Sequence, residues 1–214
     1  MNKNDYNENM LYHLNNSGCY TKLKKNPIRK VSKVVKDLIK SSNEHNTKNL
    51  IETNPYTPRI YGAPKIHKEG VPIRPIVNTI GGPTYHLAKY LAKKLKPLVG
   101  NTRSFVKYSN HFINEIKQIK LDQNDILVSF NVKSLYTNIP IGESMELIQK
   151  FIDPDTTKLV EVFLRSTFFS YKDDIYEQTC GMAMGSPLSP IIANLFMEHF
   201  ETNSIDSSPL KPKL

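Results

Sequence analysis

The amino-acid sequence predicts an α+β protein in which a small antiparallel sheet packs on helices. Two observations lead to this class: apolar residues recur at helical spacing in several segments, and short β-branched runs broken by proline lie between them. The chain has 214 residues, enough for one ordinary domain or two small ones. Apolar residues make up 39% of it, which allows a real but modest core.

The first 55 residues are predicted to form an N-terminal arm that is partly disordered. Residues 1–27 are polar and rich in asparagine, so we expect them to be poorly ordered. Residues 28–40 place apolar side chains on one side and cations on the other, which predicts a basic amphipathic helix. Its cations are Arg29, Lys30, Lys33, Lys36 and Lys40. The sequence leaves open whether they form a solvated face or contact nucleic acid.

The main domain is predicted over residues 56–200, with a Ser/Pro/Lys-rich tail over residues 201–214. Prolines break residues 58–80 into extended pieces, which predicts a hairpin-like segment. Residues 125–132 carry a continuous apolar run of strand length and are expected to be buried on both faces. A second hairpin is predicted from Tyr171 to Gln178. Helices are expected from Pro83 to Leu98, from Ser109 with its apolar residues inward, from Pro140, around Thr157–Phe168, and after Gly185-Ser186-Pro187.

The net charge of +9 favours a polyanionic partner. No Asp or Glu occurs from Gly70 to Asn114, a stretch that contains seven cations. Lys89, Lys93 and Lys96 share one helical face opposite a leucine stripe. Because crowding like charges destabilises a fold unless phosphates neutralise them, this stretch is predicted to bind nucleic acid. The residues expected to do so are Lys89, Lys93, Lys96, Arg103 and Lys107.

Cys19 and Cys180 are the only cysteines, and they lie far apart in the sequence. This spacing predicts neither a zinc knuckle nor a disulfide framework. The N-terminus lacks the apolar stretch of a signal peptide, and no apolar run approaches the ~20 residues of a membrane helix. We therefore expect a soluble protein in a reducing, intracellular setting.

Four segments occur in a meaningful order along the chain. They are Tyr-Gly-Ala-Pro-Lys-Ile-His-Lys at 61–68, Val-Pro-Ile-Arg-Pro-Ile-Val at 71–77, Val-Ser-Phe-Asn-Val-Lys-Ser-Leu-Tyr-Thr-Asn at 128–138, and Gly-Met-Ala-Met-Gly-Ser-Pro-Leu-Ser-Pro at 181–190. With these motifs, residues 56–214 resemble the fingers and palm of the reverse transcriptase of Penelope-like retroelements. The resemblance implies an RNA-directed DNA polymerase that binds an RNA/DNA template–primer and dNTP, uses Mg²⁺, and works in the nucleus.

The resemblance also assigns roles to individual residues. Lys65 and Arg74 occupy the positions that grip the phosphates of the incoming nucleotide, Arg74 with a bidentate fork. Tyr136 stands where an aromatic side chain closes against the 2′ position of the sugar. Gly185, Ser186 and Pro187 occupy the motif B loop, where backbone and small side chains approach the template and the nascent base pair.

Two departures from the family pattern predict that this chain is inactive alone. Asn131 stands where the family carries the motif A Asp, so a neutral amide replaces an anionic Mg²⁺ ligand. The aromatic-x-Asp-Asp pair that follows motif B has no counterpart. The segment Tyr171-Lys172-Asp173-Asp174 precedes motif B, so it is interpreted as a solvated turn. We accordingly expect no intact catalytic residue, no tightly held metal, and a fragment that ends shortly before the Asp-Asp hairpin.

Other interpretations stay open from the sequence. The chain is either a reverse-transcriptase fragment, a non-catalytic nucleic-acid-binding protein derived from a retroelement, or a polymerase subunit completed by another chain. A small-molecule enzyme is the outside alternative, but its candidate residues show no metal-ligand spacing; they are His67, His86, His111 and His199. The sequence does not indicate an oligomeric state.

Overall fold

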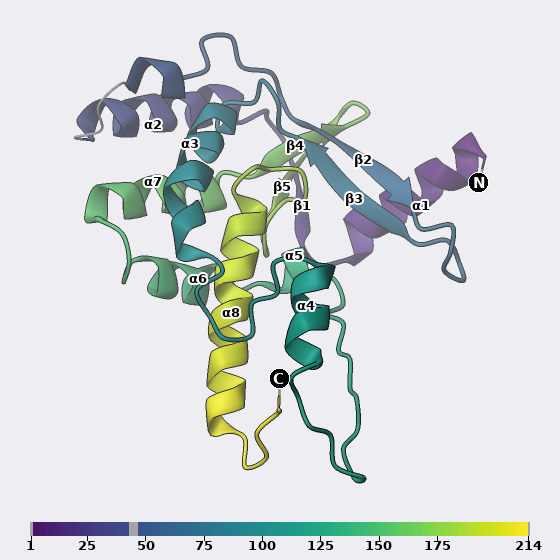
Figure 1. Ribbon diagram of the computed structural model, residues 1–214. Helices are drawn as coiled ribbons and strands as arrows, with labels where there is room; N and C mark the ends of the chain where they lie inside the picture. The colour runs from purple at the N-terminus through teal and green to yellow at the C-terminus, as the bar shows by residue number, and fades with distance from the viewer. Residues whose placement is uncertain (1, 43–46, 214) are drawn as a thin grey trace.

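A computed structural model of the chain describes residues 2–42 and 47–213. Its strands form one sheet in the order β1-β5-β4-β2-β3 (Figure 1). The strands are β1 (Tyr20–Leu23), β2 (Arg59–Pro64), β3 (Ile73–Asn78), β4 (Phe168–Tyr171) and β5 (Asp174–Gln178). β2 and β4 are parallel and the other neighbours are antiparallel. The predicted α+β class is confirmed, with the correction that the sheet is mixed.

Eight α-helices occur in the part of the chain that the structure describes. They are α1 (Lys3–Asn16), α2 (Ile28–Ser41), α3 (Tyr85–Leu95), α4 (Ser109–Ile116), α5 (Leu135–Asn138), α6 (Ile141–Ile148), α7 (Pro154–Arg165) and α8 (Ser189–Ser207). Two 3₁₀ turns are also described: η1 (Thr47–Leu50) precedes β2, and η2 (Lys96–Leu98) directly follows α3. None of the described helices combines the length and apolar character needed to cross a membrane. α8 continues into the segment that was expected to be a tail.

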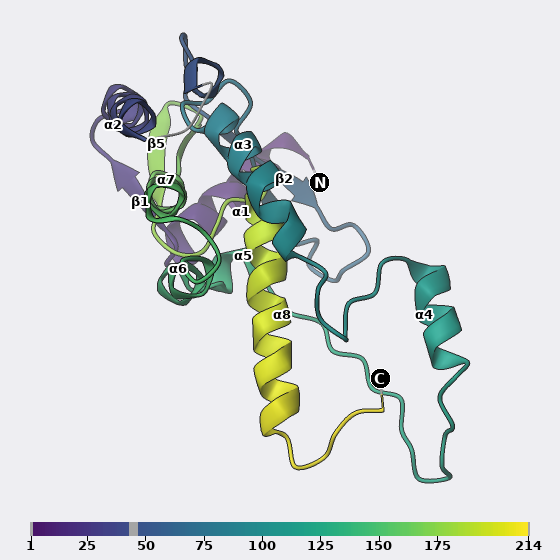
Figure 2. The ribbon, with the colours of Figure 1, turned by 60° about the vertical axis from the view of Figure 1, so that its left-hand side comes forward.

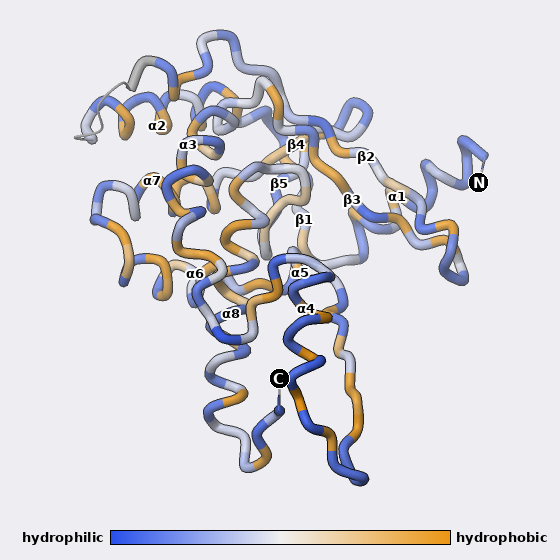
Figure 3. The backbone as a smooth tube through the Cα atoms, viewed as in Figure 1, coloured by the Kyte–Doolittle hydropathy of each residue, from blue (hydrophilic) through white to orange (hydrophobic). Residues whose placement is uncertain are grey.

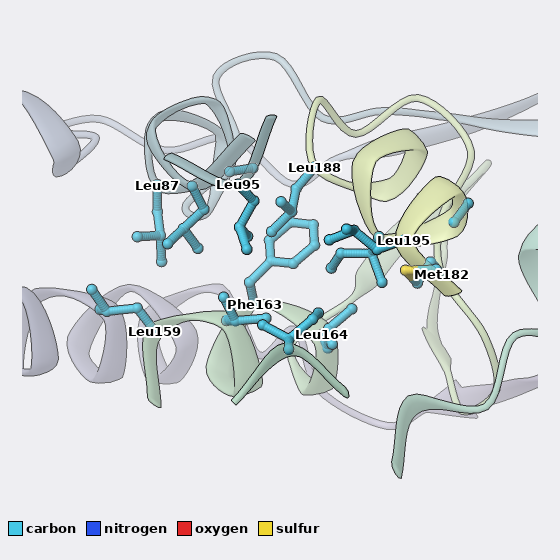
Figure 4. Packing of buried hydrophobic residues seen from close by; sticks show 14 of the residues in the cluster. Leu87, Leu95, Leu159, Phe163, Leu164, Met182, Leu188 and Leu195 are labelled. Atoms are coloured by element: carbon cyan, nitrogen blue, oxygen red, sulfur yellow. The ribbon is translucent and has the colours of Figure 1, made fainter. Parts of the chain in front are cut away.

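The larger hydrophobic core lies between α3, α7 and α8 (Figure 4). Leu87, Leu91 and Leu95 form the predicted leucine stripe of α3, and all three are fully buried. They meet Phe163 of α7 and Leu188 at the start of α8. The apolar periodicity of α3 therefore predicted its buried face correctly, and its lysines are left on the outside.

The expectation that residues 1–27 are poorly ordered is wrong for the described residues among them. Met10 and Leu14 lie four positions apart on α1, and both are fully buried in a second core against the sheet. The Gly62 amide of β2 donates to the Tyr6 hydroxyl at 2.7 Å. β1 pairs along its length with β5. The asparagine-rich composition of this region suggested disorder and obscured the apolar face of α1 that packs against the sheet.

The expectation that the two cysteines stay unpaired is also wrong. Cys19 and Cys180 form a disulfide whose ends lie 161 residues apart in the sequence. The pairing of Tyr20 with Gln178 in the β1–β5 ladder brings the two cysteines together at the end of that ladder. A contact made by strand pairing leaves no local signal in the spacing of two cysteines.

The apolar run at residues 125–132 is not a strand, which corrects a central expectation. Leu127 is 89% exposed and Phe130 is 92% exposed. The run belongs to a segment between α4 and α5 that projects from the body of the molecule (Figure 2), and it is apolar over much of its length (Figure 3). α4 likewise buries none of its residues, although its apolar side was expected to face inward. Strand propensity alone does not make a strand, because its backbone groups need a paired neighbour.

The hairpin predicted from Tyr171 to Gln178 is confirmed by the pairing of β4 with β5. Tyr171 pairs with Asp174, so Lys172 and Asp173 form a two-residue turn, and Lys172 has a left-handed φ of 52°. Asp174 forms an ion pair with Lys22 of β1 at 2.8 Å. Asp173 therefore lies in the turn, as predicted, whereas Asp174 is the first residue of β5.

Asp153 caps α7 and makes the stability of the protein sensitive to acid. Its carboxylate accepts from the hydroxyl of Thr156 at 2.6 Å and from the Thr156 amide at 2.8 Å, and Lys94 lies 3.3 Å away. The hydrogen bonds from Thr156, with a smaller contribution from Lys94, hold the pKa of Asp153 well below its usual value. Because the pKa is lower in the folded chain, this stabilisation is complete above the unfolded pKa of about 3.9 and is lost as the pH falls through the folded pKa.

We therefore expect Asp153→Ala to lower the free energy of unfolding by about 1 kcal/mol at pH 7. Asp153→Asn is the matched variant, because Asn caps helices about as well as Asp but does not titrate. It is expected to keep most of the stability at pH 7 and to lose less than the unmodified chain between pH 5 and pH 2. Urea denaturation across this pH range measures both effects, and equal losses in the two proteins would refute the assignment.

Candidate nucleotide and nucleic-acid site

The hairpin of β2 and β3 carries two cations on one face. Ala63 pairs with Arg74, and the Lys65 amide continues the ladder by donating to the Pro72 carbonyl at 2.9 Å. Because side chains alternate along a strand, Lys65 shares the face of Ala63 and lies diagonally across from Arg74. Arg74 is exposed and Lys65 is half-buried. Neither forms an ion pair within the described residues, so both are available to an anion.

The loop of residues 181–186 packs against β3. The Val77 amide donates to the Met184 carbonyl at 2.7 Å, and the Thr79 hydroxyl donates to the Gly185 carbonyl at 3.2 Å. A Cβ at Gly185 would lie 2.2 Å from the Val77 carbonyl oxygen, and the φ of Gly185 is +108°. Only glycine fits this position, so the close approach of the loop to β3 depends on it.

The same loop is attached to α5, which carries Tyr136. The Met182 amide donates to the Tyr136 carbonyl at 2.7 Å. A Cβ at Gly181 would lie 2.1 Å from that carbonyl oxygen and 2.5 Å from Cα of Thr137. Three segments that the sequence singled out separately are therefore held together by backbone contacts: the β2–β3 hairpin, α5 and the loop.

Ser186 and Pro187 lie where this loop enters α8. Ser186 is only 4% exposed, and its hydroxyl accepts from the Leu188 amide at 3.3 Å. Pro187 is half-buried and Gly185 is exposed. The hydroxyl of Ser186 thus shapes the start of the helix, and the exposed part of the loop is centred on Gly185.

Five cations that were predicted to bind nucleic acid are exposed. Lys89, Lys93 and Lys96 are exposed on the face of α3 and η2 that is opposite the buried leucines. Arg103 and Lys107 are exposed in the segment that leads to α4. None of these five forms an ion pair with a carboxylate in the described part of the chain.

A family model of the reverse transcriptase (RNA-dependent DNA polymerase) matches residues 66–207. This match covers well over half of the chain, including α3, α5, the loop and α8. The chain belongs to the reverse transcriptase family. Comparison with curated proteins finds no match. The domains of this family bind a nucleic-acid template–primer and dNTP and generally use a divalent metal ion.

The residues of this reverse transcriptase domain do not fit a two-metal site around Asn131. Asn131 is exposed in the projecting segment and offers a neutral amide oxygen. No group of three His, Cys, Asp or Glu side chains suited to a metal gathers within residues 2–42 and 47–213. Mg²⁺ prefers several anionic oxygen ligands. The neutral amide of Asn131 therefore does not replace the anionic ligand that Mg²⁺ prefers at this position.

Sequence reasoning missed how the parts of the reverse transcriptase domain are joined. It singled out Gly185 but not Gly181, whose contact with Tyr136 becomes visible only in three dimensions. It also missed Tyr6, which binds the hairpin from α1. The sequence signal for Gly181 was its place at the start of the fourth motif, whereas nothing in the asparagine-rich context marks Tyr6.

Proposed function

We propose that this reverse transcriptase domain is of the Penelope-like type, binds a primer–template and an incoming dNTP, and does not polymerise by itself. The order of the four motifs and the residues in them support the Penelope-like subtype. The observation that carries the binding proposal is the attachment of one loop to both the hairpin and α5, through Val77–Met184 and Tyr136–Met182. This attachment supports the proposal because it joins the segments that carry the proposed phosphate, sugar and base-pair positions.

In this proposal different residues contact different parts of the nucleotide. Lys65 and Arg74 bind the triphosphate, and the planar guanidinium of Arg74 is suited to two phosphate oxygens at once. Tyr136 lies against the sugar and disfavours a 2′-hydroxyl by steric exclusion. Gly185, with neighbouring Ser186, lets the loop backbone approach the nascent base pair.

The basic face of α3 is proposed to hold the primer–template. Lys89, Lys93 and Lys96 recur at spacings of four and three residues, and Arg103 and Lys107 extend the positive charge beyond η2. Pro187 borders the template side of the loop. Contacts of this kind neutralise phosphates and release counterions, so they provide affinity without sequence preference.

Asn131 is proposed as one cause of the lack of polymerisation. In two-metal phosphoryl transfer, carboxylates offset the repulsion between two dications only ~4 Å apart. The neutral amide of Asn131 does not supply that charge. The chain would then bind the primer–template and the dNTP but would not catalyse phosphoryl transfer between them.

The test uses an RNA template annealed to a labelled DNA primer. Fluorescence anisotropy over a salt series is expected to show binding that weakens with salt, with a log–log slope of about −3 to −5 for the phosphates contacted. A complementary dNTP is expected to tighten the complex, and Lys65→Gln with Arg74→Gln is expected to remove that tightening. Addition of Mg²⁺ and all dNTPs is expected to yield no extended primer.

Asn131→Asp tests whether the missing carboxylate is one cause of inactivity, and Asn124→Asp is its control because it adds the same charge to the same exposed segment. Extension by Asn131→Asp alone would support the assignment, whereas extension by the unmodified chain would refute it. Absence of salt-dependent binding would refute the whole proposal.

The second candidate function is a nucleic-acid-binding protein without nucleotide recognition. The observation that favours it is the set of unpaired cations on α3, which needs no nucleotide site to act. Binding of the primer–template that no dNTP strengthens would favour this alternative over the first proposal.

A further inference from the structure

We propose that α2 presents a second interface for the phosphate backbone of nucleic acid, separate from the face on α3. Four cations of α2 form a single stripe, at Arg29, Lys33, Lys36 and Lys40. At 100° per residue they fall within about 60° of arc. The inference rests on the proposed function only in that the partner is a nucleic acid.

The structure places this stripe away from the body of the protein. Val35 and Ile39 are the buried residues of α2, and by the same rotation they lie about 130° and about 90° around the helix from the centre of the stripe. All four cations of the stripe are exposed, as is the neighbouring Lys30. α2 packs on α7, the helix that also supports α3 (Figure 1), so both basic helices are held by one rigid core.

The charge of this region is not balanced by the protein. From Lys24 to Lys40 there are seven cations and one carboxylate, Asp37. None of the stripe cations forms an ion pair with a described carboxylate. Cations elsewhere often do: Lys22 pairs with Asp174, and Arg165 pairs with Glu161. Uncompensated like charges on one helix repel one another, and binding to a polyanion relieves that repulsion.

The dimensions of the stripe match a nucleic-acid backbone. Eleven residues separate its first and last cations, a rise of about 16 Å. One strand of B-form DNA places about five phosphates over that length. The alternative polyanion is a membrane surface, but an interfacial helix inserts its apolar face into the lipid. The apolar face of α2 is already occupied by the core, so nucleic acid is the partner that the structure favours.

The test neutralises the stripe by changing Arg29, Lys33, Lys36 and Lys40 to glutamine. Its matched control changes four exposed lysines outside both basic helices, Lys117, Lys120, Lys150 and Lys172, to glutamine. The two variants have the same net charge, so a general loss of electrostatic attraction affects both equally. Circular dichroism and urea denaturation establish that each variant is folded.

Binding to a 30-base-pair duplex is then measured from 50 to 300 mM salt. The stripe variant is expected to bind at least tenfold more weakly than the control at 100 mM salt, and to lose about 2 to 4 from the magnitude of its salt slope. Equal affinities and slopes in the two variants would overturn the inference. So would a stripe variant that binds the duplex like the control but loses binding to vesicles containing phosphatidylserine.

The outcome is distinguishable from failure of the proposed function. If the unmodified chain binds primer–template but the stripe variant is unaffected, only the role of α2 is refuted. If the unmodified chain binds no nucleic acid at any salt concentration, both proposals fail together.

Discussion

Removal of the Cys19–Cys180 disulfide is expected to lower the free energy of unfolding by about 4 kcal/mol. The bond closes a loop with a sequence separation of 161 residues, so it removes a large share of the conformational freedom of the unfolded chain. In the folded chain it fixes β1 beside β5, next to the loop that begins at Gly181. Urea denaturation with and without dithiothreitol measures the loss.

The double variant Cys19→Ser/Cys180→Ser is the control for the reductant. It is expected to unfold at the same urea concentration with or without dithiothreitol, and to match the reduced unmodified chain. Titration of free thiols in the denatured protein checks the bond directly. If protein that has not been exposed to a reductant contains two reactive thiols, the disulfide does not form.

Gly181→Ala is expected to destabilise the protein by about 3 kcal/mol or more. The residue has a left-handed φ of +62°, which costs an L-residue roughly 1–2 kcal/mol. The added Cβ would also lie 2.1 Å from the carbonyl oxygen of Tyr136. Because that neighbour is backbone, it cannot rotate away as a side chain would, so the loop has to separate from α5. Urea denaturation measures the loss.

Gly18→Ala separates the two contributions. Gly18 has a similar φ of +72°, but nothing lies within 4 Å of the added Cβ. This control is expected to lose only about 1 kcal/mol, the cost of the backbone conformation. If both variants lose the same amount, the contact between Gly181 and Tyr136 does not hold in solution. If Gly181→Ala loses more, the loop and α5 are joined as described.

Much of the helical part of the fold could be predicted from local pattern. The stripe of Leu87, Leu91 and Leu95 indicated both the helix α3 and its buried side, and the basic side of α2 was equally clear. A helix satisfies most of its backbone hydrogen bonds internally, so its residues carry enough information to reveal it. The turn between β4 and β5 could also be predicted, because the residues that form it are neighbours in the sequence.

Two segments show where the prediction of strands from local pattern fails. Residues 125–132 have the composition of a buried strand, yet Phe130 is 92% exposed. Residues 20–23 have no such composition, yet they form β1, because β5 offers them a partner. Strand pairing is decided between distant segments, and the sequence of one segment does not show whether a partner lies beside it.

The sequence by itself determined the family motifs, their order, the helical faces and the places where positive charge is concentrated. Only the tertiary structure decided that α1 and β1 belong to the sheet, that Cys19 meets Cys180, and that one loop connects the hairpin to Tyr136. The physical reason is the range of the contacts. Periodicity and charge are properties of neighbouring residues, whereas a contact such as that of Thr79 with Gly185 joins residues 106 positions apart and exists only once the chain has folded.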